Sequence, residues 1–367
     1  MRKKYNNRIN NIYCSTKYIL LLILNIIILI LLQRENKKKN KKKQIKKIGV
    51  ISVRHETNVG NNLIKYAMSI ILKEFGYSPY IIGTHWDNMS ISFINKTTNL
   101  VIINKNFSEI KKDDYDILMV NSDQTWRKFD EHFYDYGFLK FAENWNIKKF
   151  VYGASIGFDN WKLSYKDDQI CKRLLKNFSG ISIREEGSKK LIEDHFGIIP
   201  TVVLDPTLLI DKKYYLNIIK DYKNKMNMKK KYIFIYTVFY SKYIIDAINE
   251  ACRIFNYDAY YFLLNKTSST EDFIYYMVNS NAVLTNSFHG TVFSIIFNKP
   301  FITIYDKINA KERFSSLANL FGIQERMFEN HQKINYEQLI KPLNIDYKLL
   351  NKLKSKSINF IKKNLEK

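Results

Sequence analysis

The sequence predicts an α/β protein of two Rossmann-like domains that face each other across a cleft, preceded by an N-terminal hydrophobic anchor. Short apolar runs alternate with segments of helical periodicity up to about residue 210, and the alternation resumes at residue 232. The lysine-rich segment 211–231 between them is only weakly patterned. An apolar run with basic flanks at residues 18–32 predicts the anchor.

Residues 48–210 form the first predicted domain. Its helices are expected where apolar residues recur at helical spacing, over 63–75, over 168–178 and through Leu191 to about Gly197. Its strands are expected at the short apolar runs 48–53, 117–120, 150–154, 181–184 and 201–204. Strands that alternate with helices in this way make a doubly wound α/β domain.

Residues 232–335 form the second predicted domain, with the same alternation. The expected strands are 232–239, 259–264, 282–285 and 301–305, and the expected helices are 244–255, 272–278 and 290–297. Ligands of such sheets bind outside the carboxyl ends of the strands. The strand-to-helix junctions are therefore the places where chemistry is expected.

The charge of the chain is concentrated near its ends. The net charge is +24, but residues 1–47 alone contain 14 Lys and Arg and a single acidic residue. A basic stripe on a folded face is missing from the pattern, so we expect no nucleic-acid partner. The three cysteines form neither a disulfide framework nor a zinc-binding spacing, and no metal or cofactor is expected.

The two terminal segments carry separate predictions. Residues 1–47 comprise a tail, an uncleaved membrane anchor at 18–32 and a polybasic linker. Nine Lys and Arg follow the apolar run and five precede it, which favours the large domain on the cytoplasmic side, with a Golgi or secretory lumen as the alternative. Residues 336–367 predict a basic helix, either solvated or lying on anionic lipid.

Two junctions of the first domain carry polar side chains suited to a sugar or an anion. At the first, Asn58 and Asn61 stand where a helix begins, and the free backbone N–H groups there bind an anion or a sugar hydroxyl. An ordinary turn, capped by the asparagines, is the alternative. At the second, Asp123, Gln124 and Trp126 follow an apolar strand and combine the groups typical of a saccharide site, although helix capping explains part of the pattern.

Two further junctions carry cations. Arg184 closes a buried strand, where its guanidinium suits a carboxylate or phosphate, or an ion pair with Glu185 or Glu186. The fourth junction is the most specific: His289 lies at the start of an apolar helix beside Ser287, Gly290 and Thr291. Lys307 follows the next strand and supplies a second cation.

In order along the chain, the segments TNVGNNLIKYA, DILMVNSDQTW, KFVYGASIG, ISIREEGSKKLIEDHFG, VVLDPTLL, VLTNSFHGTVFSIIFNKPF and RFSSLANLFGIQERM resemble those of the polysaccharide pyruvyl transferase family. The resemblance covers about residues 48–330. It implies a fold like that of the GT-B glycosyltransferases. It also implies transfer of pyruvate from phosphoenolpyruvate, a substrate rather than a cofactor, onto two hydroxyls of one sugar of a polysaccharide, which gives a cyclic ketal and phosphate.

The resemblance also assigns roles to residues. Arg184 and His289 correspond to residues that bind the donor and act in catalysis. Lys307 corresponds to the cation that follows the next strand in the family. From the junctions themselves we expect Ser287, Gly290 and Thr291 on the donor side, and Asn58, Asn61, Asp123, Gln124 and Trp126 on the acceptor side. His289 is expected to protonate the methylene carbon of the donor, while Arg184 and Lys307 hold the departing phosphate.

Two other functions fit the same predicted fold. A GT-B-type glycosyltransferase would use a nucleotide-sugar donor and would require a cluster of charges for its diphosphate. A non-catalytic, membrane-tethered sugar-binding protein would be expected to lack the cations of the cleft, but Arg184, His289 and Lys307 are all present.

Overall fold

The computed structural model describes residues 45–52, 58–83, 92–93, 102–104, 106–157, 161–223, 230–263 and 268–366, together with Ile27, Ile28 and Leu31. Contacts divide the chain into two units, 1–45 and 46–367, and the fold below is that of the second unit. The predicted anchor, 18–32, lies outside the described residues except at those three positions. Within the described part of the chain, no helix is long and apolar enough to cross a membrane.

The N-terminal half of the unit is built on a seven-stranded parallel sheet with strand order β3-β2-β1-β4-β5-β6-β7. Its strands are β1 (Lys47–Ile51), β2 (Ser78–Gly83), β3 (Ile102–Asn104), β4 (Ile117–Val120), β5 (Lys148–Ala154), β6 (Gly180–Ile183) and β7 (Thr201–Val202). Its α-helices are α2 (Val59–Glu74), α4 (Phe133–Phe138), α5 (Tyr165–Leu175) and α6 (Ser188–Phe196), and short 3₁₀ helices include η3 (Lys140–Ala142) and η4 (Pro206–Leu208).

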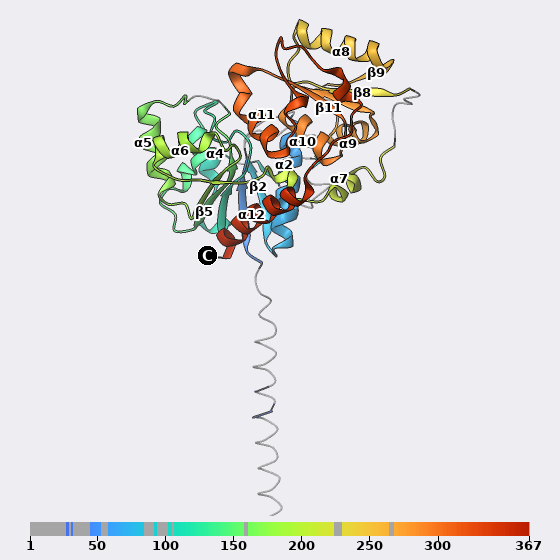
Figure 1. Ribbon diagram of the computed structural model, residues 1–367. Coiled ribbons are helices and arrows are strands. Elements are labelled where there is room, and N and C mark those ends of the chain that lie inside the picture. Colours follow the sequence, from blue (N-terminus) through green and yellow to red (C-terminus); the bar gives the residue numbers. More distant parts are fainter. Residues whose placement is uncertain are drawn as a thin grey trace, which may run out of the picture. The chain divides into compact units, whose positions relative to one another are not determined.

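The C-terminal half is built on a five-stranded parallel sheet with strand order β12-β11-β10-β8-β9 (Figure 1). Its strands are β8 (Tyr232–Tyr236), β9 (Asp258–Phe262), β10 (Ala282–Thr285), β11 (Phe301–Tyr305) and β12 (Met327–Glu329). Its helices are α8 (Lys242–Phe255), α9 (Thr270–Asn279), α10 (Phe288–Ile296) and α11 (Lys307–Phe321), followed by α12 (Tyr347–Glu366). The described part of the weakly patterned segment between the halves contains helix α7 (Lys212–Ile218).

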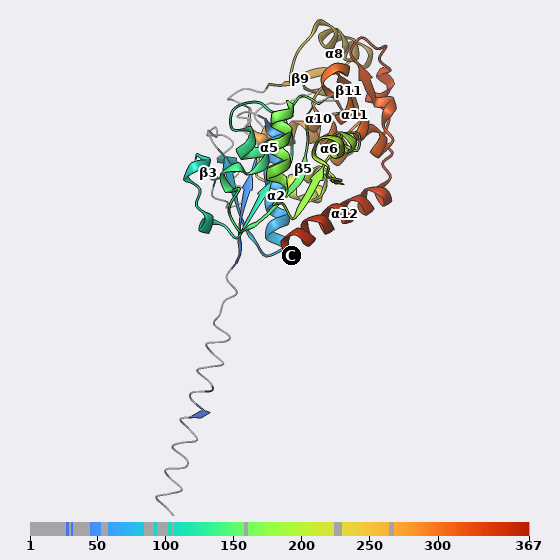
Figure 2. The same cartoon turned by 90° about the vertical axis from the view of Figure 1, so that its left-hand side faces the viewer.

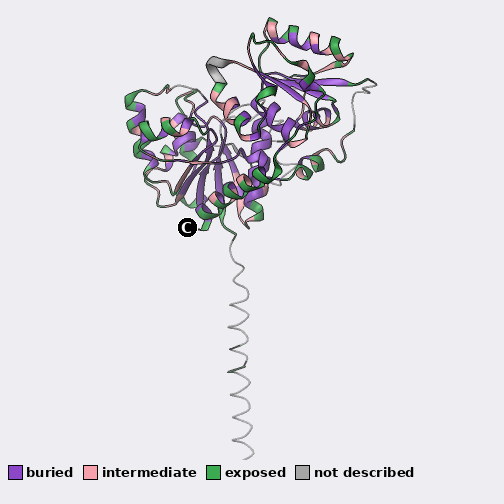
Figure 3. Cartoon of the chain, in the orientation of Figure 1, coloured by how far each residue is buried: buried purple, intermediate pink, exposed green. Residues whose placement is uncertain are grey.

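Three apolar layers separate and cover the two sheets, because alternate residues of each strand point to opposite faces. In β1, Ile48 and Val50 enter a central cluster while Ile51 enters the cluster under α4, α5 and α6. In β8, Phe234 enters the same central cluster and Ile233 packs beneath α8. The central cluster therefore joins the two halves through α2 and α10, and these elements are buried in Figure 3.

The last helix packs on the N-terminal half instead of remaining solvated, as Figures 1 and 2 show for α12 beside α2 and β5. Ile361 and Leu365 are buried in the central cluster. Asn364 lies against Gly180, where a Cβ atom would meet its Oδ1 at 2.3 Å. The expectation of a solvated terminal helix, drawn from its many lysines, was wrong because those lysines occupy only one side of an amphipathic helix.

Candidate active site

The carboxyl edges of the two sheets meet where α2 and α10 begin. Asn58 caps α2 by accepting a hydrogen bond from the N–H of Gly60 (2.9 Å), and Ser287 caps α10 by accepting one from the N–H of Gly290 (3.4 Å). The ring of His289 lies directly on Gly60, since a Cβ atom there would stand 2.1 Å from the histidine Nδ1. Only glycine permits this contact, so the first and fourth junctions touch each other.

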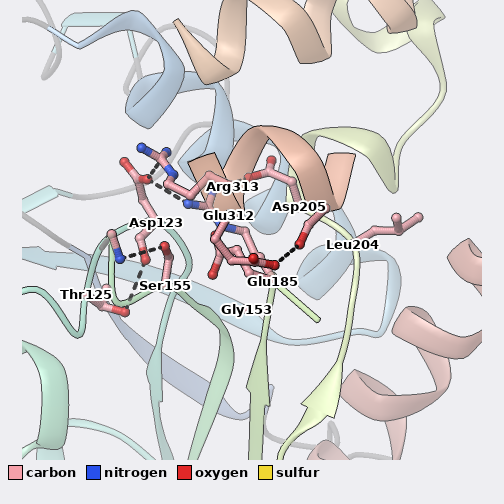
Figure 4. Close-up of polar contacts among 12 residues, drawn as sticks. Asp123, Thr125, Gly153, Ser155, Glu185, Leu204, Asp205, Glu312 and Arg313 are labelled. Carbon is pink, nitrogen blue, oxygen red and sulfur yellow. Dashed lines mark hydrogen bonds and ion pairs between the residues drawn. The ribbon is translucent and has the colours of Figure 1, made fainter. Parts of the chain in front are cut away.

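Buried charges gather beside this contact, and we call Asp123, Arg184, Glu185, Asp205 and Arg313 the ionic cluster (Figure 4). Arg184 donates one hydrogen bond to Asp205 and another to Asp123, the latter at 2.9 Å. Arg313, from α11, approaches Asp123 to 3.6 Å. The side chain of Arg184 is only 2% exposed, so its charge is compensated by protein carboxylates in this structure.

The ring of Phe288 contacts both guanidinium groups of the cluster. Arg184 and Arg313 each place their guanidinium carbon 4.9 Å from the centre of its ring. Such stacking partly offsets the repulsion between two cations that share one site. The residue before His289 therefore fixes the spacing of the two arginines.

Burial and pairing shift the ionisation of the cluster. Burial alone would raise the pKa of Asp205, but the neighbouring His289 and the charge of Arg184 outweigh it, and the pKa lies well below its usual range. Burial raises the pKa of Glu185 against the opposing charges of Arg184 and Arg313. Burial, reinforced by Arg184, lowers the pKa of Arg313. The cluster thus contains one strongly acidic carboxyl group and one that holds its proton more tightly than usual.

The ring of His289 is buried between Asp205 of the ionic cluster and Gly60 of α2. Its Nε2 stands 3.7 Å from Oδ2 of Asp205 and has no hydrogen-bond partner among the described residues. The opposite edge of the ring faces Gly60. A buried nitrogen without a partner is costly, so Nε2 is suited to a proton or a ligand atom that approaches from the ionic cluster.

Asp205 is held in place from three sides. Its Oδ1 accepts hydrogen bonds from the N–H and the hydroxyl of Thr207, at 3.0 and 2.6 Å. The peptide groups of the preceding Leu204 are also bound: its N–H donates to Ser357 of α12 (2.9 Å), and its carbonyl accepts from Tyr152 of β5 (2.8 Å). Through Leu204, the last helix of the chain therefore supports the carboxylate that faces His289.

Asp123 is positioned by an unusual backbone conformation. Its φ angle is +83°, which is uncommon for a residue other than glycine. Its carbonyl accepts hydrogen bonds from the N–H groups of Thr125 (2.7 Å) and Ser155 (2.9 Å), which tie the end of β4 to the end of β5. Such strain is typical of sites where one side chain must point in a defined direction.

Other predicted site residues mainly support the backbone. Ser287 caps α10, and Gly290 lets that helix approach β10, because a Cβ atom would stand 2.1 Å from Oγ1 of Thr285. Thr291 bonds to the Ser287 carbonyl (3.2 Å) and to Thr303 (2.7 Å). Asn61 is buried, and its Nδ2 has no partner in the described part of the chain.

Trp126 differs from the expectation for a saccharide site, whereas the role of Gln124 stays a prediction. The indole of Trp126 is 2% exposed, stacks on Phe138 and donates to the carbonyl of Gly137 at 3.0 Å. It belongs to the apolar layer under α4, so a sugar does not reach it in this structure. Gln124 accepts a hydrogen bond from Arg127 at 2.9 Å. The pattern beside Asp123 was misleading because a tryptophan near polar residues fits a core position as well as a sugar platform.

Two predicted parts of the site lie outside what the structure describes. The backbone of Lys307 begins α11, but its side chain is not among the described ones. Residues 53–57 of the first junction are also outside the described residues. The predicted role of Lys307 as a second cation remains a prediction.

Asp205 and Arg313 were missed as site residues, although both lie in segments that carried the family resemblance. Asp205 belongs to VVLDPTLL and Arg313 opens RFSSLANLFG. Glu312, next to Arg313, lies against Gly187, where a Cβ atom would stand 1.9 Å from its Oε1. Arg313 lies near the middle of α11, where a charged residue is typical of an exposed helix face, so only the fold brings it to Asp123.

A small pocket adjoins the cluster and lies between the halves. Arg184, Asp205, Phe288, Arg313 and Ser316 are among its lining residues, and its volume is about 30 Å³. That is room for about two water molecules. Within the described residues, no group of three or more His, Cys, Asp or Glu side chains is placed to hold a metal ion.

Comparison with known sequences identifies the family. A family model described as polysaccharide pyruvyl transferase matches residues 58–307, which is more than half of the chain and includes the site residues predicted from sequence, from Asn58 to Lys307. The comparison with curated proteins gave no match.

Comparison with solved structures identifies the fold. UDP-GlcNAc 2-epimerase from Methanocaldococcus jannaschii is similar with a TM-score of 0.53 and 16% identity, over 80% of this chain and 90% of that one. The enzyme from Neisseria meningitidis, solved bound to UDP-GlcNAc, gives a TM-score of 0.52 and 11% identity, over 86% and 94%. At such identities the likeness shows the fold alone, and it confirms the predicted GT-B-like arrangement of two parallel α/β sheets.

Proposed function

Because the chain belongs to the polysaccharide pyruvyl transferase family, we propose that it transfers pyruvate from phosphoenolpyruvate onto two hydroxyls of one sugar, forming a cyclic ketal and releasing phosphate. One observation carries the proposal. Four junctions that are spread over more than 200 residues of sequence come together in the fold. Gly60 touches His289, and Arg184, Asp123 and Arg313 meet beside this contact.

The arginines of the ionic cluster supply the charge that the donor requires. Phosphoenolpyruvate carries a carboxylate and a phosphate, and the two guanidinium groups that contact Phe288 offer planar pairs of donors for such groups. Arg184 is now bound to Asp123 and Asp205, and the adjoining pocket holds only about two waters. The donor therefore binds to a more open state, in which its own anionic groups replace the carboxylates as partners of the arginines.

His289 is the proposed general acid. Its Nε2 proton passes to the methylene carbon of the donor, whose double-bond electrons form the new C–H bond, and positive charge develops at C2. One sugar hydroxyl attacks C2, the C2–O bond to phosphate breaks, and the neighbouring hydroxyl closes the ketal. Of the two hydroxyl protons released, one restores protonated His289 and the other leaves on the phosphate. Asp205, 3.7 Å from Nε2, stabilises the protonated imidazole before transfer. None of these steps requires a metal or a cofactor, and we propose Lys307 as an additional phosphate ligand.

The membrane location is a separate proposal. We propose that residues 18–32 anchor the enzyme and that the unit 46–367 acts on the cytoplasmic side, where phosphoenolpyruvate is made. Support comes from the larger number of Lys and Arg after the apolar run than before it. Protease digestion of sealed vesicles from either side tests the orientation.

Thermal unfolding of the full-length chain with added ligand tests the donor. Phosphoenolpyruvate at 100 times its Kd stabilises the native state by about 2.7 kcal/mol. We expect a shift with phosphoenolpyruvate that is lost in His289→Asn and kept in the control His132→Asn, whose histidine is exposed. A shift with UDP-sugars alone would contradict pyruvyl transfer and favour the nucleotide-sugar glycosyltransferase. No shift with either would favour the non-catalytic sugar-binding protein.

A further inference from the structure

An unusual group of exposed aromatic side chains lies on the C-terminal half. Phe239 and Tyr240 follow β8 and are 41% and 44% exposed, and Tyr261 of β9 is 44% exposed. Among the described residues only six Phe and Tyr side chains are this exposed, and these are three of them. We call Phe239, Tyr240 and Tyr261 the aromatic strip.

The strip starts beside the proposed general acid. In the sheet, β8 lies between β10 and β9, with Tyr236 opposite Thr285 on one side and Phe262 on the other. The segment after β8 therefore leaves the same edge as the Ser287–His289 segment, one strand away. From β10 to β9 the distance along this edge is two strand spacings, or about 10 Å.

Asn286 fixes the strip to the catalytic segment. Its Oδ1 accepts a hydrogen bond from the N–H of Val238 (2.7 Å), and its Nδ2 donates to the carbonyl of Phe239 (2.8 Å). Asn286 is buried and lies three residues before His289. The backbone at Val238 and Phe239 is thus tied to the segment that carries His289, while the side chains of Phe239 and Tyr240 remain exposed.

The outer end of the strip lies on the neighbouring strand. β9 pairs with β8 in parallel, with Phe262 opposite Tyr236, so Tyr261 lies one strand away from the end of β8, which Phe239 and Tyr240 follow. Rigid aromatic rings offer a large contact area at little cost in conformational entropy. The apolar face of a sugar ring stacks on such rings, while the phenol groups bond to its hydroxyls.

We propose that the aromatic strip is the acceptor subsite for an oligosaccharide whose reacting sugar lies at His289 and whose neighbouring sugars stack on Phe239, Tyr240 and Tyr261. The proposal rests on the proposed function, which requires a saccharide within reach of His289. It assigns to the C-terminal half a part of acceptor binding that the sequence assigned to Asn58, Asp123 and Trp126. It also requires more than one sugar unit in a good acceptor.

The test is saccharide binding by the full-length chain, purified in detergent. A printed glycan array identifies a glycan that binds the wild-type chain, and titration of that glycan gives its Kd. For the Phe239→Ala/Tyr261→Ala double variant we expect the Kd to rise about tenfold, as for aromatic residues at other binding hot spots. The control Tyr165→Ala removes an even more exposed tyrosine, on α5, and leaves the Kd unchanged.

Shortening the glycan gives a second readout. In the wild-type chain a disaccharide binds more tightly than its terminal monosaccharide, and in the double variant this difference disappears. An equal Kd in the double variant and the control would overturn the proposal. The absence of any binding glycan would also overturn it. So would a double variant that loses binding to anionic vesicles, or self-association, while its affinity for the glycan is unchanged.

The outcome is separable from that of the proposed function. Stabilisation by phosphoenolpyruvate, measured in the same variants, stays at its wild-type value if the strip binds only the acceptor. Glycan binding that depends on the strip, without any phosphoenolpyruvate shift or phosphate release, would support the saccharide subsite and contradict pyruvyl transfer.

Discussion

The ionic cluster and the aromatic strip, which lie at different strands of the two sheets, differ in almost every physical respect. The cluster is buried, and its charged groups are held by one another: Arg184 binds two carboxylates, and Asp205 binds Thr207 as well. The strip is exposed, and the backbone beside it is held by a hydrogen bond from the N–H of Val238 to Asn286. The ionic cluster therefore resembles a protein core in its burial and its internal contacts, whereas the aromatic strip resembles an ordinary protein surface.

This difference predicts how variants divide between folding and function. A buried charge that loses its partner destabilises the fold strongly, whereas truncation of an exposed ring changes little besides binding. Variants of the cluster should therefore affect stability and activity together. Variants of the strip should affect acceptor binding alone. Variants of His289 should mainly lower the rate of the proposed reaction.

The largest expected effect on stability is that of Arg184→Met. It leaves the buried carboxylates of Asp123 and Asp205 without their main cation, which should lower the free energy of unfolding by about 3–5 kcal/mol. In the control, Arg253→Met removes an exposed arginine paired with Glu250 and should change the free energy of unfolding far less, because solvent screens an exposed ion pair. Urea unfolding measures both. Similar losses in the free energy of unfolding of the two variants would show that the ionic cluster does not stabilise the fold more than an exposed ion pair does.

His289→Asn should act mainly on the reaction. Loss of a general acid should reduce turnover about 10²–10⁴-fold, measured as phosphate release from phosphoenolpyruvate with a saccharide acceptor. Stability should change far less than in Arg184→Met, because Nε2 has no hydrogen-bond partner among the described residues. A large loss of stability with unchanged turnover would instead assign His289 a structural role.

Acid should weaken the cluster through Asp205. The folded-state pKa of Asp205 is depressed, so its contribution to stability is present above the ordinary carboxyl pKa and is lost as the pH falls towards the folded value. Glu185 has the opposite sign: its pKa is raised, and its contribution is lost as the pH rises through the folded value. We expect Asp205→Asn to be less stable at pH 7 and to lose less stability than the wild type between pH 5 and pH 3. A parallel loss in both proteins would contradict the assignment.

Gly60→Ala should test the contact between the two junctions. The new Cβ atom would stand 2.1 Å from Nδ1 of His289, and such overpacking costs about 1–3 kcal/mol. Elsewhere in a helix the same change is stabilising by about 1 kcal/mol. The loss should shrink in a His289→Ala background, where the imidazole ring is absent and only the Cβ atom of residue 289 remains. Equal losses in both backgrounds would mean that the histidine does not rest on this glycine.

These contrasts also explain which features could be predicted from sequence. Apolar runs such as 117–120 and 282–285 identify β4 and β10 because buried parallel strands are almost continuously apolar. The edge strand β12 was not predicted, because three residues carry too little periodic signal. The position of His289 followed from its helix start, which is a local property.

The partners of the site residues could not be predicted, because they come from distant parts of the chain. Nothing in the sequence around Arg313 indicates Asp123, which is 190 residues earlier, and nothing around Trp126 indicates that Phe138 covers its ring. The exposure of Phe239 and Tyr240 is equally a property of the assembled sheet, since an aromatic pair after a strand is as typical of a core as of a surface.

The smallest effect we predict is also the most distant from the reacting atoms. Ser357 of α12 accepts a hydrogen bond from Leu204, the residue before Asp205, so Ser357→Ala should cost about 1 kcal/mol of stability. Because the same peptide positions the carboxylate that faces His289, kcat should fall as well and its pH profile should shift. Ser355→Ala, two residues earlier on the exposed side of α12, removes a hydroxyl bonded only within its own helix. If the two serine variants lose equal stability and neither changes the pH profile, α12 supports the fold but not the site, and the ionic cluster is positioned by β4, β6 and α11 alone.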